Sequence, residues 1–71
     1  RKWGDKERAL LIHGIEKHGV GAWNVIRDEL LNEWDEADLR VKAARLMGRQ
    51  SLALYKGWKG GEKEIEAEYE K

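Results

Sequence analysis

ADLRVKAARLMGRQ, residues 37–50, is the stretch that decides how the chain folds. At about 100° per residue, Leu39, Ala43 and Leu46 fall on one narrow stripe of a helix. The basic side chains of the stretch lie away from that stripe: Arg40, Lys42, Arg45 and Arg49. The pattern predicts a helix that is buried along one side and presents positive charge to an anionic partner along much of the rest.

Charge is segregated along a chain whose formal net charge is zero. Residues 1–36 hold 6 Lys and Arg against 8 Asp and Glu, residues 37–61 hold 6 against 1, and residues 62–71 hold 2 against 5. Local potential steers a charged partner over distances near the Debye length of about 10 Å. We therefore expect an anion to approach the middle segment.

Length and composition limit the class of protein. A chain of 71 residues has room for one domain, and the absence of cysteine excludes a disulfide framework and a thiolate zinc site. No apolar run approaches the roughly 18 residues of a membrane span, and the first residues do not resemble a signal peptide. We expect a soluble domain excised from a longer intracellular protein.

Two further helices are predicted before residue 37. The first runs from Gly4 or Asp5 to about Lys17 and stops at Gly19, and the second runs from Ala22 or Trp23 to about Asn32. Asp35 can then cap the helix of residues 37–50, with Asp38 three residues further on. Because no strand signal appears anywhere, the predicted fold class is all-α.

The chain after residue 47 is predicted to bend at Gly48 and form a fourth helix over SLALYKGWK, residues 51–59. Trp34 and Trp58 are expected to be buried under that helix. We place the domain at residues 1–61. Residues 62–71 form an acidic tail, either helical or disordered, with little to bury.

No catalytic or metal site is predicted. Ser51 is the only serine and no histidine neighbours it in sequence. His13 and His18 are five residues apart, so they do not converge on one metal ion, and His18 is expected to interact with the last carbonyls of its helix. Gly60-Gly61 lacks the spacing of a phosphate-binding loop. We expect neither an enzyme nor a cofactor.

The spacing of bulky positions resembles the Myb/SANT family. Trp3 and Trp23 are 20 residues apart and Ala43 lies 20 further on, close to the spacing of the family's three core tryptophans. The resemblance covers residues 3–48. Further residues match the family pattern: Glu7, Leu11, Ile15, His18, Gly19, Ile26, Leu39, Lys42 and Leu46.

The resemblance implies a three-helix Myb/SANT-like, homeodomain-like bundle. Its core would hold Trp3, Leu11, Ile15, Trp23, Ile26, Leu39, Ala43 and Leu46. Ala43 replaces the third tryptophan, and we expect Trp34 or Trp58 to fill the space. ADLRVKAARL is also similar to the recognition helix of telomere-type Myb domains. That motif's tryptophan and following basic residue fall on Ala43 and Ala44, so telomeric specificity is not implied.

A helix-turn-helix variant of this family implies double-stranded DNA as partner and a nuclear transcription or chromatin factor as the parent protein. Residues 37–49 would enter the major groove. Asp38 can accept from a cytosine amino group, Lys42 and Arg45 can reach guanine or phosphate, and Val41 or Ala37 can touch a thymine methyl. Arg40, Arg49 and Lys56 suit the phosphate backbone.

Three alternatives stay open. The first is a SANT-type module that uses the acidic residues of the first two helices and the acidic tail to bind histone tails or a subunit of a chromatin complex. In the second, the acidic tail folds back on the basic helix and weakens DNA binding. In the third, the basic helix is only a solvated face, or another element covers the small apolar side chains of Ala37, Val41 and Ala44.

Overall fold

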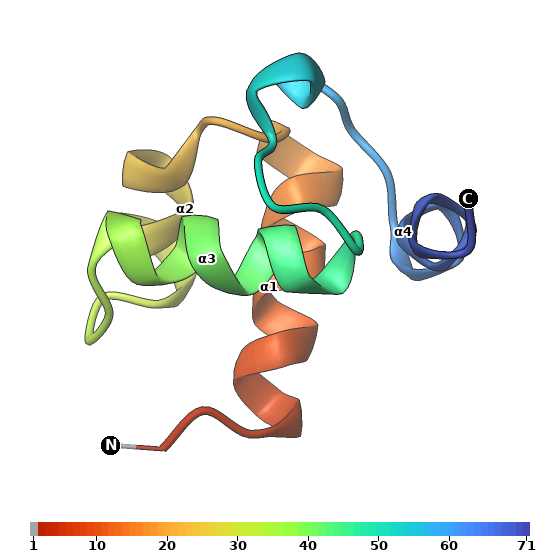
Figure 1. Ribbon diagram of the computed structural model, residues 1–71. Helices are drawn as coiled ribbons and strands as arrows, with labels where there is room; N and C mark the ends of the chain where they lie inside the picture. Colours follow the sequence, from red (N-terminus) through yellow and green to blue (C-terminus); the bar gives the residue numbers. More distant parts are fainter. Residues whose placement is uncertain (1) are drawn as a thin grey trace.

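The computed structural model describes residues 2–71, which form an all-α bundle without a β-strand (Figure 1). The predicted fold class is confirmed. Within these residues there are four α-helices and one short 3-10 turn: α1 (Asp5–His18), α2 (Trp23–Leu30), α3 (Glu36–Leu46), η1 (Ala53–Tyr55) and α4 (Glu62–Tyr69). None of the described helices is long and apolar enough to cross a membrane.

Three helices begin with the same hydrogen bond. A carboxylate in the first turn accepts the N–H of the residue before the helix: Glu7 from Gly4 at 2.9 Å, Asp38 from Asp35 at 3.2 Å, and Glu64 from Gly61 at 2.8 Å. The Gly4 N–H, with the backbone N–H of Glu7 itself, lowers the pKa of the Glu7 carboxyl. The expected start of α3 at Asp35 and Asp38 is confirmed.

The core lies where α2 packs against both α1 and α3. Six of the eight predicted core side chains are buried: Leu11, Ile15, Trp23, Ile26, Leu39 and Ala43. The other two, Trp3 and Leu46, are half-buried and pack at the edge of this core. The two aromatic rings Trp3 and Trp34 meet edge to face, with centroids 5.0 Å apart, and close the core beside the N-terminus.

Gly14 lets α1 and α2 approach closely. A Cβ atom built on Gly14 would lie 2.6 Å from Cγ2 and 2.9 Å from Cγ1 of Ile26, which is fully buried. No larger residue fits this position without moving the helices apart. The closest part of the α1–α2 contact therefore depends on a glycine inside a helix.

The predicted fourth helix over residues 51–59 is wrong. Only Ala53–Tyr55 forms a 3-10 turn, and the backbone beyond it pairs with the loop between α1 and α2. Val20 N–H donates to the carbonyl of Trp58 at 2.8 Å, and Gly57 N–H donates to the carbonyl of Val20 at 2.8 Å. Gly57 adopts a φ of +85°, which a helix does not contain. This tertiary pairing takes the backbone groups that a helix would need.

The expected burial of two tryptophans under that helix is also wrong. Trp34 packs against Trp3, and Trp58 meets Tyr55 edge to face with centroids 6.1 Å apart. Both tryptophans are half-buried. Each of these tryptophan rings therefore packs against another aromatic ring and not against a fourth helix.

The fourth α-helix lies instead in the acidic segment, beside the C-terminal end of α3 (Figure 1). The expectation that residues 62–71 have little to bury is wrong, since Ile65 is 1% exposed and belongs to the core. Glu68 is 9% exposed and accepts hydrogen bonds from Tyr55 Oη at 2.7 Å and Lys71 Nζ at 2.8 Å. Burial of Ile65 and the Tyr55–Glu68 hydrogen bond attach α4 to the bundle, and the Lys71 bond stays within the C-terminal segment.

Candidate nucleic-acid interface

One side of α3 remains uncovered by the rest of the described chain. In Figure 1, α3 crosses in front of α1 with no other element over its near side. Four residues, each about one helical turn or less from the next, make up this α3 outer face: Ala37, Arg40, Val41 and Arg45. All four are exposed, and Val41 keeps 47% of its surface accessible. The face combines two guanidinium groups with small apolar side chains.

Arg40 and Arg45 have no ionic partner among residues 2–71, because neither takes part in an ion pair or side-chain hydrogen bond there. Other arginines of the chain are engaged. Arg8 pairs with Glu62 at 2.9 Å, and Arg27 Nε donates to the carbonyl of Trp34 at 3.0 Å. Two exposed, unpaired guanidinium groups on one helix face can receive anions or base edges.

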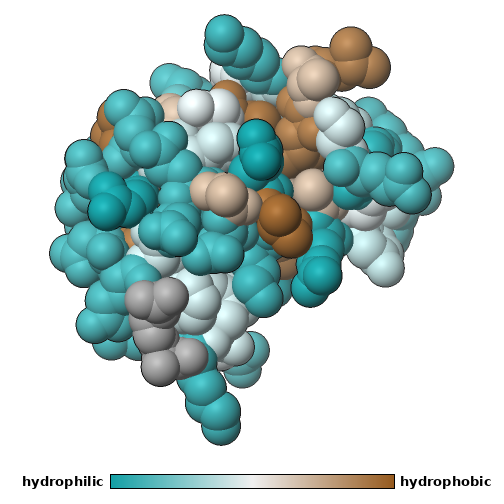
Figure 2. Space-filling model, turned by 60° about the vertical axis from the view of Figure 1, so that its left-hand side comes forward, coloured by the Kyte–Doolittle hydropathy of each residue, from teal (hydrophilic) through white to brown (hydrophobic). Residues whose placement is uncertain are grey.

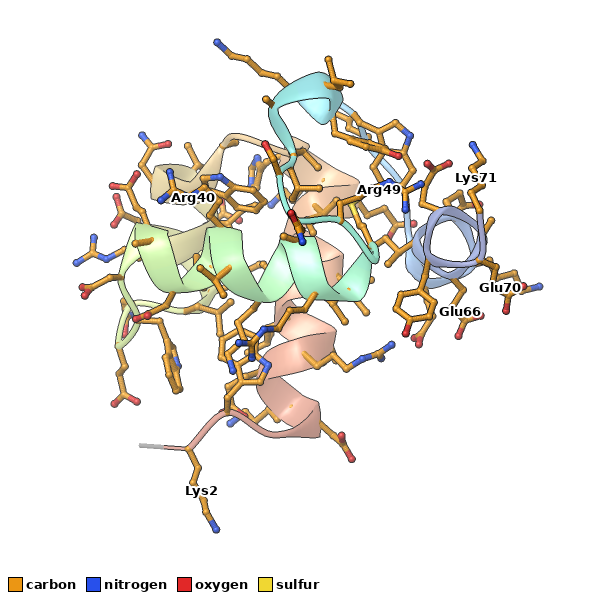
Figure 3. All side chains as sticks on the ribbon, viewed as in Figure 1. Lys2, Arg40, Arg49, Glu66, Glu70 and Lys71 are labelled. Atoms are coloured by element: carbon orange, nitrogen blue, oxygen red, sulfur yellow. The ribbon has the colours of Figure 1, made fainter. Side chains whose placement is uncertain are left out.

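Three predicted contact residues make contacts inside the molecule. Lys42 Nζ lies 5.4 Å from the centre of the Trp3 ring, and the Asp38 carboxylate accepts from Asp35. Arg49 donates to the carbonyls of Met47 and Gly48 at 3.2 and 3.3 Å (Arg49 is labelled in Figure 3). The sequence predicted the Asp35–Asp38 pair only. The contact with Trp3 depends on how the N-terminal segment packs, and the bonds of Arg49 depend on how the chain turns after α3.

The segment after Gly48 covers part of the same side of α3, towards the C-terminal end of the helix. Ala44 is 9% exposed, and its carbonyl accepts the N–H of Arg49 at 2.9 Å. The expectation that another element covers Ala37, Val41 and Ala44 therefore holds for Ala44 only. Ala37 and Val41 remain exposed.

A groove of about 680 Å³ lies between α3 and this following segment. We call it the α3 groove; its apolar lining comes from Val20, Trp23, Val41, Ala44, Leu52 and Ala53. Figure 2 shows apolar side chains that are exposed between hydrophilic ones on one face of the molecule. Nothing in the sequence pattern predicted this groove, because residues 50–53 reach it only through the turn at Gly48.

Acidic groups flank the basic face at both ends. Asp35 and Glu36 stand at the start of α3, and a second groove brings Arg45 together with Glu66 and Glu70 of α4. In Figure 3 these two glutamates project from α4 on the side of the molecule opposite Arg40. The positive potential of the α3 outer face is therefore confined to its middle.

The acidic residues of α1 and α2 are largely engaged. Glu29 accepts from His18 Nε2 at 3.1 Å and from Lys17 Nζ at 3.2 Å, which lowers the pKa of the Glu29 carboxyl. Asp28 pairs with Arg27 at 2.9 Å. His18 thus bonds to a carboxylate, and its expected interaction with the helix-end carbonyls is wrong. Within residues 2–71 no group of His, Cys, Asp or Glu side chains could hold a metal ion.

Comparison with known families finds no family that matches this chain, and comparison with curated proteins finds no match either.

Proposed function

We propose that this chain is a double-stranded-DNA-binding module of a nuclear transcription or chromatin factor, built on a Myb/SANT-like bundle. The observation that carries the proposal is the α3 outer face. Arg40 and Arg45 are exposed there and have no ionic partner, and exposed Val41 lies between them. An α-helix with its side chains is about 10–12 Å across and fits a major groove about 12 Å wide, and the 11 residues of α3 give it a length of about 16 Å.

Each side chain of the face has a chemical role in this proposal. Arg40 and Arg45 donate to guanine acceptors or phosphate oxygens, and Val41 and Ala37 lie against thymine methyl groups. Lys42 contributes charge from its position over Trp3. Asp38 and Arg49 have smaller roles, because DNA contact would cost each of them a hydrogen bond inside the protein.

The alternative of a SANT-type module for basic histone tails has less support. It requires a cluster of unpaired carboxylates on the first two helices or on α4. Glu7, Asp28 and Glu29 are all engaged by neighbouring groups. On α4, Glu62 pairs with Arg8, and Glu64 and Glu68 accept hydrogen bonds, which leaves mainly dispersed acids. Dispersed, solvated charges give weak and unspecific attraction for a basic peptide.

A fluorescence-anisotropy titration with a labelled duplex of about 16 base pairs, at about 50 and 200 mM salt, tests the proposal. Replacing both arginines (Arg40→Ala with Arg45→Ala) should weaken binding at low salt by about tenfold or more and flatten the salt dependence. The matched control is Lys6→Ala with Lys63→Ala, two exposed cations off this face. No binding at low salt, or equal losses in both double variants, would contradict the proposal.

A further inference from the structure

The α3 groove has a chemistry that duplex binding does not use. Its floor is formed by Val20, Trp23, Ala44 and Leu52, all buried or nearly so, with Val41 at its edge. A phosphate backbone offers nothing apolar to fill such a floor, and base edges reached from the α3 outer face would touch only Val41 of the groove's apolar residues. A ligand that fills the groove must bring an apolar group of its own.

The rim of the groove is positively charged. Arg40 lines it from α3 and Lys56 lines it from the turn after η1, while Gln50 and Ser51 add neutral hydrogen-bonding groups. The chain contains 14 acidic residues, yet none of them lines this groove. The groove therefore selects a ligand with negative charge around an apolar centre.

Backbone hydrogen bonds fix the segment that lines the groove opposite α3. Tyr55 N–H donates to the carbonyl of Leu52 at 2.9 Å, and two bonds join Val20 to Gly57 and Trp58 at 2.8 Å each. A preformed site costs its ligand less ordering free energy. Its volume of about 680 Å³ lies within the usual range of ligand pockets and accommodates one or two large side chains.

We propose that the α3 groove docks an acidic peptide segment of a partner protein. One large aliphatic or aromatic side chain of the segment enters the apolar floor, and carboxylates flanking it pair with Arg40 and Lys56. Tyr69 of a second copy is also an exposed aromatic side chain beside acidic residues, so concentration-dependent dimerisation of the chain without peptide would overturn the choice of a partner's segment. The inference stands apart from DNA binding, although both ligands would use Arg40 and Val41.

Fluorescence anisotropy with the fluorescein-labelled peptide EDELFDDE tests the inference on the whole chain. Two control peptides separate the apolar contribution to binding from the contribution of charge. EDESSDDE lacks the apolar pair, and QNQLFNNQ lacks the charges. We expect EDELFDDE to bind and both controls to bind at least about tenfold more weakly. Equal affinity for EDELFDDE and EDESSDDE would overturn the proposal, since only charge would then be recognised.

Surface variants locate the binding without disturbing the core. We expect a loss of affinity for EDELFDDE of about fivefold or more in the single variant Val41→Ser, and a similar loss in the double variant Arg40→Ala with Lys56→Ala. The matched controls are Val25→Ser, an exposed valine on α2, and Lys6→Ala with Lys63→Ala, which should leave the affinity unchanged. Equal effects of test and control variants would overturn the assignment to this groove.

Absence of peptide binding up to about 1 mM would also overturn the proposal. If Lys56→Ala then weakened binding of a DNA duplex, the groove would belong to the DNA surface instead. Because the peptide titration contains no DNA, its failure is distinct from failure of the proposed DNA function.

Discussion

At the scale of single residues, contacts that the sequence cannot display decide the roles of several side chains. The helical period indicated which residues of α3 share a face, and Arg40, Val41 and Arg45 are exposed together as that period requires. The same period could not reveal the Trp3 ring under Lys42 or the carbonyls bound by Arg49. Residue type and spacing therefore predict which face of a helix a side chain lies on, but not which group outside that helix it contacts.

Gly14 gives a direct test of packing at this scale. Gly14→Ala should destabilise the fold by about 1–3 kcal/mol, because the new methyl group would clash with Ile26, although alanine favours a helix by about 1 kcal/mol over glycine. Urea unfolding measures the change. His13→Ala, at an exposed position of the same helix, is the control and should change little. An unchanged or higher stability of Gly14→Ala would contradict the close α1–α2 contact.

Glu68 makes the stability of the fold depend on pH. Hydrogen bonds from Lys71 and then Tyr55 lower the pKa of the Glu68 carboxyl below its usual 4.5. Its contribution is therefore present above the unfolded-state pKa and is lost as the pH falls through the lower folded-state pKa. Glu68→Gln should reduce stability near neutral pH and flatten its decline in acid.

Urea unfolding midpoints from about pH 7 to about pH 2 check this expectation. Glu66→Gln, at an exposed position of the same helix, is the matched control. If both variants give curves parallel to that of the parent protein, the link between Glu68 and acid stability is refuted.

At the scale of elements, α1, α2 and α3 could be predicted and the segments after them could not. Regular apolar spacing marks all three helices, and first-turn carboxylates mark α1 and α3. The stretch SLALYKGWK, residues 51–59, has helical spacing too, yet its backbone pairs with Val20 through contacts distant in sequence. The acidic stretch of residues 62–71 has a composition that looks too polar for packing against the bundle. One buried aliphatic residue, Ile65, and one hydrogen-bonded glutamate, Glu68, nevertheless attach it there.

Ile65 should therefore matter more than the composition of α4 suggests. Ile65→Ala removes a side chain that is 1% exposed and should lower the free energy of unfolding by about 2–5 kcal/mol. Lys63→Ala, on the exposed side of the same helix, should change it by less than about 0.5 kcal/mol. Thermal or urea unfolding measures both, and similar values for the two variants would mean that α4 does not stabilise the bundle.

At the scale of the whole molecule, the placement of charge links stability to binding. The acidic helix α4 packs beside the basic end of α3, and Glu66 and Glu70 share a groove with Arg45. Deleting residues 62–71 would remove these charges together with the buried side chain of Ile65. Substitution of the exposed acids tests the electrostatic effect without that loss.

Glu66→Gln with Glu70→Gln removes repulsion between these carboxylates and the DNA phosphates, and should raise duplex affinity about two- to fivefold at about 50 mM salt. The gain should be much smaller at about 200 mM, because salt screens that repulsion. Glu16→Gln with Asp28→Asn changes the net charge equally on α1 and α2 and is the control. Equal gains in both double variants would show that only net charge matters, and the placement of α4 would then have no special effect.

The most direct test of the central claim is a chemical-shift map of the 15N-labelled protein during titration with a DNA duplex. If α3 enters the major groove, the largest shifts should fall on Ala37, Arg40, Val41 and Arg45 and their neighbours, with α2 and the far side of α1 little changed. Shifts concentrated on the acidic surface of α1 and α2, or no shifts at low salt, would contradict the claim that this helix binds DNA.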